Sequence, residues 1–240
     1  MEIILDILYL FVAAYTLYFL ALALRNLNDT SFKREKRYSQ YEEKDNLAVV
    51  IYSHNNKRTL ENLVRELKMQ DYPINNFKVF AILDNCSDGS QELFVNDSFV
   101  HVIDVKGVGT IGKDQAISIL LEQLSHDGLI DSYVFIDGDR SIAPDFLTTV
   151  NAALSKAHVI SGETIIDMKN LGPVDRVKAA YQKYHMNFIR KARSLFGLAS
   201  QADSGVFIIK QEIVKQIGDV DFKDINTELK YSLLLSKIKF

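Results

Sequence analysis

The hydrophobic and polar positions divide the chain into an apolar N-terminal segment and a longer part in which apolar and amphipathic runs alternate. Residues 3–24 contain a single charged side chain, Asp6, and their apolar positions surround a helix on all sides. At about 1.5 Å per residue, such a helix can cross a hydrocarbon core of roughly 30 Å. The pattern predicts a transmembrane helix over residues 1–24; a buried helix of a globular domain is the alternative.

From residue 46 onward, short β-branched runs alternate with stretches whose apolar positions have helical spacing. The runs predict strands over residues 47–53, 77–84, 101–105, 132–139, 158–166 and 206–210. The stretches predict helices over residues 59–70, 91–96, 112–125, 146–157, about 174–195 and 227–240. This alternation predicts an α/β fold, in which a mostly parallel, Rossmann-like sheet carries helices on both faces.

Charge and composition also predict where in the cell the protein lies. The segment 25–45 is rich in basic residues and is predicted to be a juxtamembrane linker, which leaves residues 46–240 as one domain. Positive charge next to a span marks the cytoplasmic side, so we expect a single-pass protein of the cell membrane with a cytoplasmic domain. The net charge of −3 gives no sign of a nucleic-acid surface. A lone cysteine excludes an internal disulfide.

Polar clusters follow three of the predicted strands. They occupy residues 53–56, 84–90 and 137–139. In an open α/β sheet, ligands bind outside the carboxyl ends of the strands. The three clusters are therefore expected to form one crevice.

The most informative cluster is FIDGDR, which places Asp137 and Asp139 directly after an apolar strand. Magnesium and manganese are commonly held by one or two carboxylates together with substrate phosphates. The motif predicts a metal-diphosphate site that holds manganese or magnesium. Acids that flank a glycine also make turns, which is the alternative interpretation.

The other two clusters offer less specific chemistry. Asp84 could accept hydrogen bonds from a base or a ribose, whereas Asp88 and Ser90 are expected to close the loop and to cap the helix that follows. His54 fits a pocket lining and an ordinary loop position equally well. The GVGTIGK segment lacks the Walker spacing and the Ser or Thr after Lys113, so a P-loop is rejected.

Taken together, several segments resemble family 2 glycosyltransferases of the GT-A fold. The resemblance spans about residues 47–235 and rests on VVIYSHNN, QDYP, LDNCSDGS, GKDQA, FIDGDRSIAPDFL and FGLASQADSGVFIIK. It implies a hexosyltransferase-type enzyme that takes a nucleotide-sugar, expected to be UDP-linked, and passes the sugar to a lipid-linked or polysaccharide acceptor of the cell envelope.

The resemblance also implies roles for particular residues. His54, Asn55, Asn56 and Asp84 would bind the nucleotide-sugar, and Lys113 would lie near the nucleotide or its phosphates. Asp137 and Asp139 would flank the metal, with Asp137 also contacting the donor. Each of these residues occupies a position that matches one of the family's motifs.

An inverting transferase needs a general base, which in this family is the Asp of a Glu-Asp pair. The matching residues are Thr227-Glu228, so Glu228 is the predicted base and Asp224 the alternative. Asn56 and Tyr52 stand where the family usually has Glu and often has Pro. The sequence also ends before the family's Gln-x-x-Arg-Trp motif, which suggests a shortened C-terminus.

These departures leave a second interpretation open. The chain could be a non-catalytic nucleotide-binding or assembly subunit that works with a partner subunit in polysaccharide synthesis.

Overall fold

The structure is a computed structural model that describes residues 2–27, 44–107, 109–124, 128–162, 166, 168, 171–196 and 205–217. The chain divides into two compact units. One contains residues 1–35 and 165–201, and the other contains residues 36–164 and 202–240.

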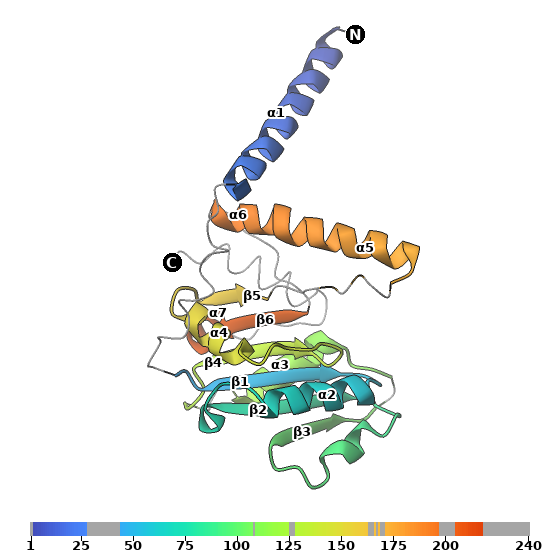
Figure 1. Cartoon of the computed structure of the whole chain (residues 1–240), viewed down its shortest axis with the longest axis vertical. Coiled ribbons are helices and arrows are strands. Elements are labelled where there is room, and N and C mark those ends of the chain that lie inside the picture. Colours follow the sequence, from blue (N-terminus) through green and yellow to red (C-terminus); the bar gives the residue numbers. More distant parts are fainter. Residues whose placement is uncertain are drawn as a thin grey trace. The chain divides into compact units, whose positions relative to one another are not determined.

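The described residues of the second unit form a six-stranded sheet in the order β3-β2-β1-β4-β6-β5 (Figure 1). The strands are β1 (Leu47–Ser53), β2 (Phe77–Asp84), β3 (Val100–Val105), β4 (Ser132–Asp137), β5 (Val159–Ser161) and β6 (Val206–Lys210). Strands β3, β2, β1 and β4 are mutually parallel, whereas β6 runs antiparallel to both β4 and β5. The predicted mostly parallel sheet is confirmed.

Helices cover both faces of this sheet, as the alternating pattern predicts. Because successive strand residues point to opposite faces, Val49 and Val50 of β1 belong to different hydrophobic clusters. The cluster that contains Val49 includes side chains from α2 (Lys57–Lys68) and α4 (Phe146–Leu154), and Figure 1 shows α2 lying over β1 and β2. The cluster that contains Val50 includes side chains from α3 (Lys113–Leu124) and α7 (Gln211–Ile217).

Some elements differ from their predicted extent. Helix α2 begins two residues before the predicted start at residue 59. The helix predicted over residues 91–96 is a 3-10 helix, η4 (Ser90–Phe94), and a second 3-10 turn, η3 (Ile74–Asn76), precedes β2. Within the described part of the strand predicted over residues 158–166, the three residues of β5 form a strand, and residues 163–165 lie outside the described residues. The helix predicted over residues 227–240 lies outside the described residues.

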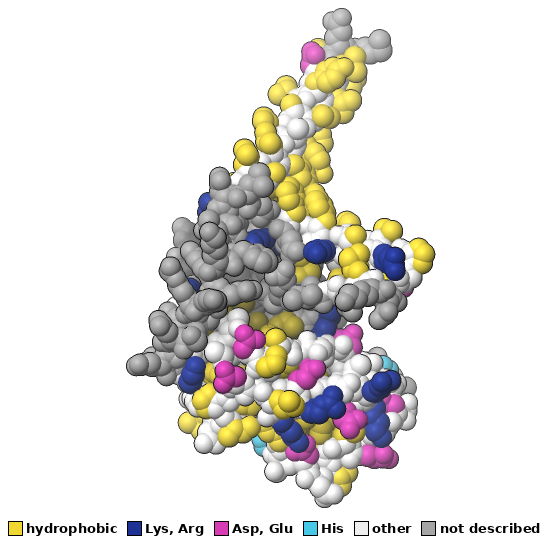
Figure 2. Space-filling view, viewed as in Figure 1, with side chains coloured by type: hydrophobic (Ala, Val, Ile, Leu, Met, Phe, Trp, Pro, Cys, Tyr) yellow, Lys and Arg dark blue, Asp and Glu magenta, His cyan; other side chains and the backbone are white. Residues whose placement is uncertain are grey.

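The other unit is helical in its described part. It contains α1 (Glu2–Leu27) and a continuous helical stretch made of α5 (Pro173–Tyr184), the π-helix η5 (His185–Arg190) and α6 (Lys191–Leu195). Within α1, residues 3–25 are long and apolar enough to cross a membrane. Hydrophobic side chains cover the surface of α1 in Figure 2. Most of the predicted linker, residues 28–43, lies outside the described part of the chain.

Candidate functional site

The three polar clusters lie at one edge of the sheet. Strand β1 is paired in parallel with β2 on one side and with β4 on the other, so the carboxyl ends of all three strands point the same way. Tyr52 is paired with Asp137 in the register of β1 and β4, and Ser53 is paired with Leu83 of β2. The convergence that the sequence predicts is therefore present.

Asp84 is the most buried acid of this edge, with no exposed surface. One oxygen accepts hydrogen bonds from the Tyr52 hydroxyl at 2.8 Å and from the Gly112 N–H at 2.9 Å, and the other accepts one from the Ile111 N–H at 3.1 Å. The carboxylate thus fastens the loop before α3 to β1. The expected bond from Asp84 to a base or ribose stays a prediction.

Tyr52 is a residue of this site that the sequence reasoning missed. Burial and the hydrogen bond to Asp84 raise the pKa of the Tyr52 hydroxyl above its ordinary value. The hydroxyl therefore remains protonated and keeps donating to Asp84. The available signal was the unusual tyrosine at a position where the family often has proline.

The loop after β1 is held against the loop after β2. His54 Nδ1 lies 2.6 Å from the Asp84 carbonyl oxygen, and because a carbonyl can only accept, Nδ1 carries the proton. Asn55 has a φ of 54°, in the left-handed region, and its side-chain oxygen accepts a bond from the Ser87 N–H at 2.8 Å. Asn56 is exposed and directly precedes α2. The exposed amides of Asn55 and Asn56 and the half-buried His54 thus stand together at the sheet edge.

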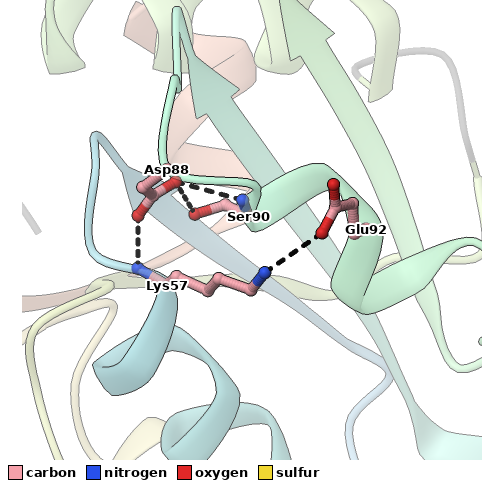
Figure 3. A network of polar contacts seen from close by, with 4 residues as sticks. All are labelled: Lys57, Asp88, Ser90 and Glu92. Atoms are coloured by element: carbon pink, nitrogen blue, oxygen red, sulfur yellow. Dashed lines mark hydrogen bonds and ion pairs between the residues drawn. The ribbon is translucent and has the colours of Figure 1, made fainter.

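Asp88 ties the second loop to the start of α2, as Figure 3 shows. Its carboxylate accepts bonds from the Lys57 N–H at 2.7 Å, the Ser90 N–H at 3.0 Å and the Ser90 hydroxyl at 2.5 Å. Burial works against ionisation, but these donors outweigh it, and the pKa of Asp88 lies below its ordinary value. Lys57 Nζ also pairs with Glu92 at 3.2 Å. The expected closure of the loop by Asp88 and Ser90 is confirmed, whereas the N-cap of the helix that follows is Gly89 rather than either of them.

Asp137 ends β4 and pairs with Lys113, the first residue of α3. Lys113 Nζ lies 2.7 Å from Asp137 Oδ1, and both side chains are about a fifth exposed, at 22% and 23%. Burial raises the pKa of Asp137 above its ordinary value, although the attraction of Lys113 opposes this. Lys113 and Asp137, two residues that the sequence assigned to the phosphates and to the metal, are therefore direct neighbours.

Asp139 is more open, with its side chain 58% exposed, and Arg140 Nε lies 3.4 Å from Asp139 Oδ1. No group of three or more His, Cys, Asp or Glu side chains that could hold a metal occurs in the described part of the chain. A cation bound at this position would have the carboxylates of Asp137 and Asp139 as ligands and would take its remaining ligands from other oxygen atoms.

Two glycines let the backbone approach closely at this site. A Cβ on Gly138 would stand 3.0 Å from both the Tyr52 carbonyl oxygen and Ser53 Cβ. A Cβ on Gly205 would stand 2.8 Å from an Arg140 guanidinium nitrogen. Gly138 donates its N–H to the Tyr52 carbonyl at 2.8 Å, so the turn between the two acids is fastened to β1.

The segment after the acidic pair is held by Glu66 of α2 and by Gln70, which follows that helix, and the sequence reasoning did not foresee this. Glu66 accepts bonds from the Ser141 hydroxyl at 2.7 Å and from the Ile142 N–H at 2.8 Å. Gln70 donates to the Ala143 carbonyl at 2.8 Å and accepts from the Leu147 N–H at 3.0 Å. Gln70 belongs to one of the motifs of the resemblance, but nothing in the sequence indicates the part played by Glu66.

The predicted catalytic residues, Glu228 and Asp224, lie outside the described residues. Their prediction is untested.

Comparison with known proteins adds a family and a fold. A family model described as "Glycosyl transferase family 2" matches residues 48–218. No curated protein matches the sequence. The chain is similar in structure to the mannosyltransferase PcManGT from Pyrobaculum calidifontis, solved with GDP-Man and Mn2+, with 17% identity and a TM-score of 0.60.

That match covers 92% of this chain and 61% of the mannosyltransferase chain. A weaker likeness is to S. aureus TarS, residues 1–349, solved with UDP-GlcNAc. There the identity is 18%, the TM-score is 0.42, and the coverage is 52% of this chain and 37% of that one. The mannosyltransferase likeness confirms the fold, and the chain spans about three fifths of that protein's length.

Proposed function

The chain belongs to glycosyl transferase family 2, and on that premise we propose that it transfers a sugar from a nucleoside-diphosphate donor to a lipid-linked or polysaccharide acceptor. The observation that carries this proposal is the pair Asp137 and Asp139 at the carboxyl end of β4, beside Lys113. Parallel α/β sheets bind ligands at that edge. The solved mannosyltransferase with GDP-Man and Mn2+ supports a nucleotide-sugar donor. A GDP-linked sugar and the expected UDP-linked sugar are therefore both donors to be tested.

The residues present fit a divalent cation. Asp137 and Asp139 offer the hard oxygen ligands that manganese and magnesium prefer, and Asp137 already holds a cationic group, the Lys113 ammonium, at 2.7 Å. A bound cation would neutralise the donor's diphosphate and so make it a better leaving group. Asp139, which is largely exposed, leaves room for phosphate oxygens on its side.

Lys113 has a part in the same step. Its ammonium lies 2.7 Å from Asp137 Oδ1, so it stands next to the acidic pair. Beside a cation held by Asp137 and Asp139, the Lys113 ammonium would add positive charge and so help to bind the negatively charged diphosphate. The Asp84 carboxylate assists by fixing Gly112, the residue before Lys113.

The nucleotide would lie against the loop of His54, Asn55 and Asn56. The positive φ of Asn55 and the bond from Ser87 keep this loop against the second one. An inverting transfer then requires a general base that removes the acceptor hydroxyl proton as the oxygen attacks the anomeric carbon and the diphosphate leaves. Glu228 is the proposed base, with Asp224 as the alternative.

We place this reaction at a membrane. The apolar part of α1, residues 3–25, supports a single span over residues 1–24, followed by a linker over 25–45 and the transferase domain over 46–240. Arg25 in the last turn of α1 supports a cytoplasmic position for that domain.

The test is a transfer assay with the full chain in detergent micelles. The micelles carry a polyprenyl-phosphate lipid as the acceptor, and release of nucleoside diphosphate from GDP- and UDP-sugars is measured with manganese. The parent is compared with Asp137→Asn, Asp139→Asn and the exposed control Asp175→Asn. We expect turnover by the parent and the control, and a loss of at least about a hundredfold in each site variant, as for removal of one strong electrostatic contact. Equal turnover by all four proteins would refute the assignment of the acidic pair.

A further inference from the structure

Helix α5 presents a stripe of apolar and aromatic side chains to the outside. Val174, Val177, Tyr181 and Tyr184 follow one another at intervals of three, four and three residues, which places them on one side of the helix. Their exposed fractions are 67%, 71%, 66% and 48%. An exposed stripe of this kind marks an interaction surface.

The surroundings of the stripe are aromatic and basic. The rings of Tyr184 and Phe188 are stacked with centroids 5.3 Å apart, and those of Tyr181 and His185 lie 6.1 Å apart. Basic residues recur along the same helical stretch: Arg176, Lys178, Lys183, Arg190, Lys191 and Arg193. Tyrosines beside lysines and arginines are typical of helices that lie in the boundary between lipid head groups and acyl chains. Figure 2 shows hydrophobic and basic side chains side by side along α5.

The same helical stretch is attached to the end of α1. Arg193 donates a hydrogen bond to the Tyr18 hydroxyl at 2.7 Å. Leu22 is 1% exposed and Ala192 is fully buried, whereas the apolar side chains of α1 before residue 18 stand largely exposed. A helix bonded to the last turns of a membrane span is held at the level where that span leaves the lipid.

We propose that the stripe of α5 lies in the surface of the bilayer that α1 crosses, with its valines and tyrosines in the head-group boundary and Lys178, on the flank of the stripe, facing anionic head groups. The inference rests on the proposed span of α1. Lipid is the occupant that the contacts favour, because the helical stretch that carries the stripe is hydrogen-bonded through Arg193 to a helix suited to lipid. Basic side chains on that stretch also complement an anionic leaflet.

The chain contains no tryptophan, so one introduced tryptophan reports on one position. Tyr181→Trp places the probe in the stripe. Gln182→Trp is the matched control, since the next helical residue points about 100° away. Each full-length variant is reconstituted into vesicles of phosphatidylcholine and phosphatidylglycerol, with or without bromine near the head-group end of the acyl chains.

We expect bromine to lower the emission of Tyr181→Trp about twofold or more, as for a side chain that enters the boundary by roughly 5–10 Å, and to leave Gln182→Trp little changed. Equal quenching of the two variants would overturn the proposal. So would a tryptophan at 181 that neither bromine nor aqueous acrylamide reaches, because a protein segment or a second copy would then cover the stripe.

A third variant separates this inference from the span. Phe11 is 68% exposed in the middle of α1, and Phe11→Trp should be quenched by bromine deep in the acyl chains. Quenching at 11 without quenching at 181 would leave the span standing and refute the surface helix. Absence of quenching at both would refute both.

Discussion

The brace between α2 and the segment after the acidic pair can be tested at Glu66. Its carboxylate accepts bonds from the Ser141 hydroxyl at 2.7 Å and from the Ile142 N–H at 2.8 Å, and Asp139 lies only two residues before Ser141. Glu66→Ala removes both acceptors. Glu66→Gln keeps the shape of the side chain and one uncharged acceptor, the amide oxygen.

The magnitude follows from the two bonds. A hydrogen bond to a charged group contributes about 1.5–3 kcal/mol, and the lower value applies here because Ser141 is exposed and Glu66 is only half-buried. Glu66→Ala should therefore remove about 3 kcal/mol of the free energy that holds the segment after the acidic pair in its ordered conformation. We assume that half of this free energy must be spent on ordering the acidic turn when the nucleotide binds. The affinity for the nucleotide then falls about tenfold, since about 1.4 kcal/mol corresponds to one factor of ten.

The assay is calorimetric titration of the full chain with a nucleoside diphosphate and manganese, alongside urea unfolding of each variant. Glu61→Ala is the control, an exposed glutamate on the same helix. We expect Glu66→Ala to bind about tenfold more weakly than the parent, Glu66→Gln to lie between them, and Glu61→Ala to match the parent. A folded Glu66→Ala that binds as tightly as Glu61→Ala would refute the reasoning.

Three further predictions concern the neighbouring contacts. Tyr52→Phe removes a donor to buried Asp84 and should lower the free energy of unfolding by about 1.5–3 kcal/mol in urea; an unchanged midpoint would count against this bond. Gly138→Ala puts a Cβ 3.0 Å from the Tyr52 carbonyl oxygen, so the backbone must move; we expect a cost of about 1–3 kcal/mol and weaker manganese-dependent binding, and a variant with parental stability would contradict the close packing. Burial raises the pKa of the Cys86 thiol, so iodoacetamide should alkylate the folded chain more slowly than the urea-unfolded chain at pH 8, with the difference shrinking as the pH rises through the raised pKa; equal rates at pH 8 would disprove the shift.

The sheet could be predicted because apolar runs in the sequence indicate where its strands lie. The run from Leu47 to Ser53 is apolar on both faces, which is typical of a central parallel strand, and β1 is indeed central. Parallel strands have their carboxyl ends at one edge, so the meeting of Asp84 with the cluster at Asp137 followed from topology alone.

The bonds that hold the site could not be predicted, because they join residues far apart in the sequence. Tyr52 and Asp84 are separated by one α2 crossover, and Glu66 meets Ile142 across 76 residues. Periodicity indicates which face a residue takes, but it does not give the register that brings two side chains within 3 Å. For the same reason Lys113 was expected near the phosphates, and its pairing with Asp137 emerged only from the structure.

The form of the short helix η4 could not be predicted, for a different reason. The residues 91–96 have the apolar spacing of a helix, but Asp88 fixes the backbone of Ser90 and Gly89 adopts a φ of 77°, so the chain enters a tight 3-10 turn. Local hydrogen bonds to Asp88 thus decided the form of η4, and the hydrophobic pattern carried no information about them.

The most direct test of the central claim is whether the acidic pair binds a nucleoside diphosphate through a cation. GDP and UDP are titrated by calorimetry into the full chain in micelles, with and without manganese, for the parent, for Asp137→Asn with Asp139→Asn, and for Asp175→Asn. We expect manganese-dependent binding by the parent and by Asp175→Asn, and none by the double variant. A folded parent that binds neither nucleotide under any metal condition, or a double variant that binds like the parent, would contradict it.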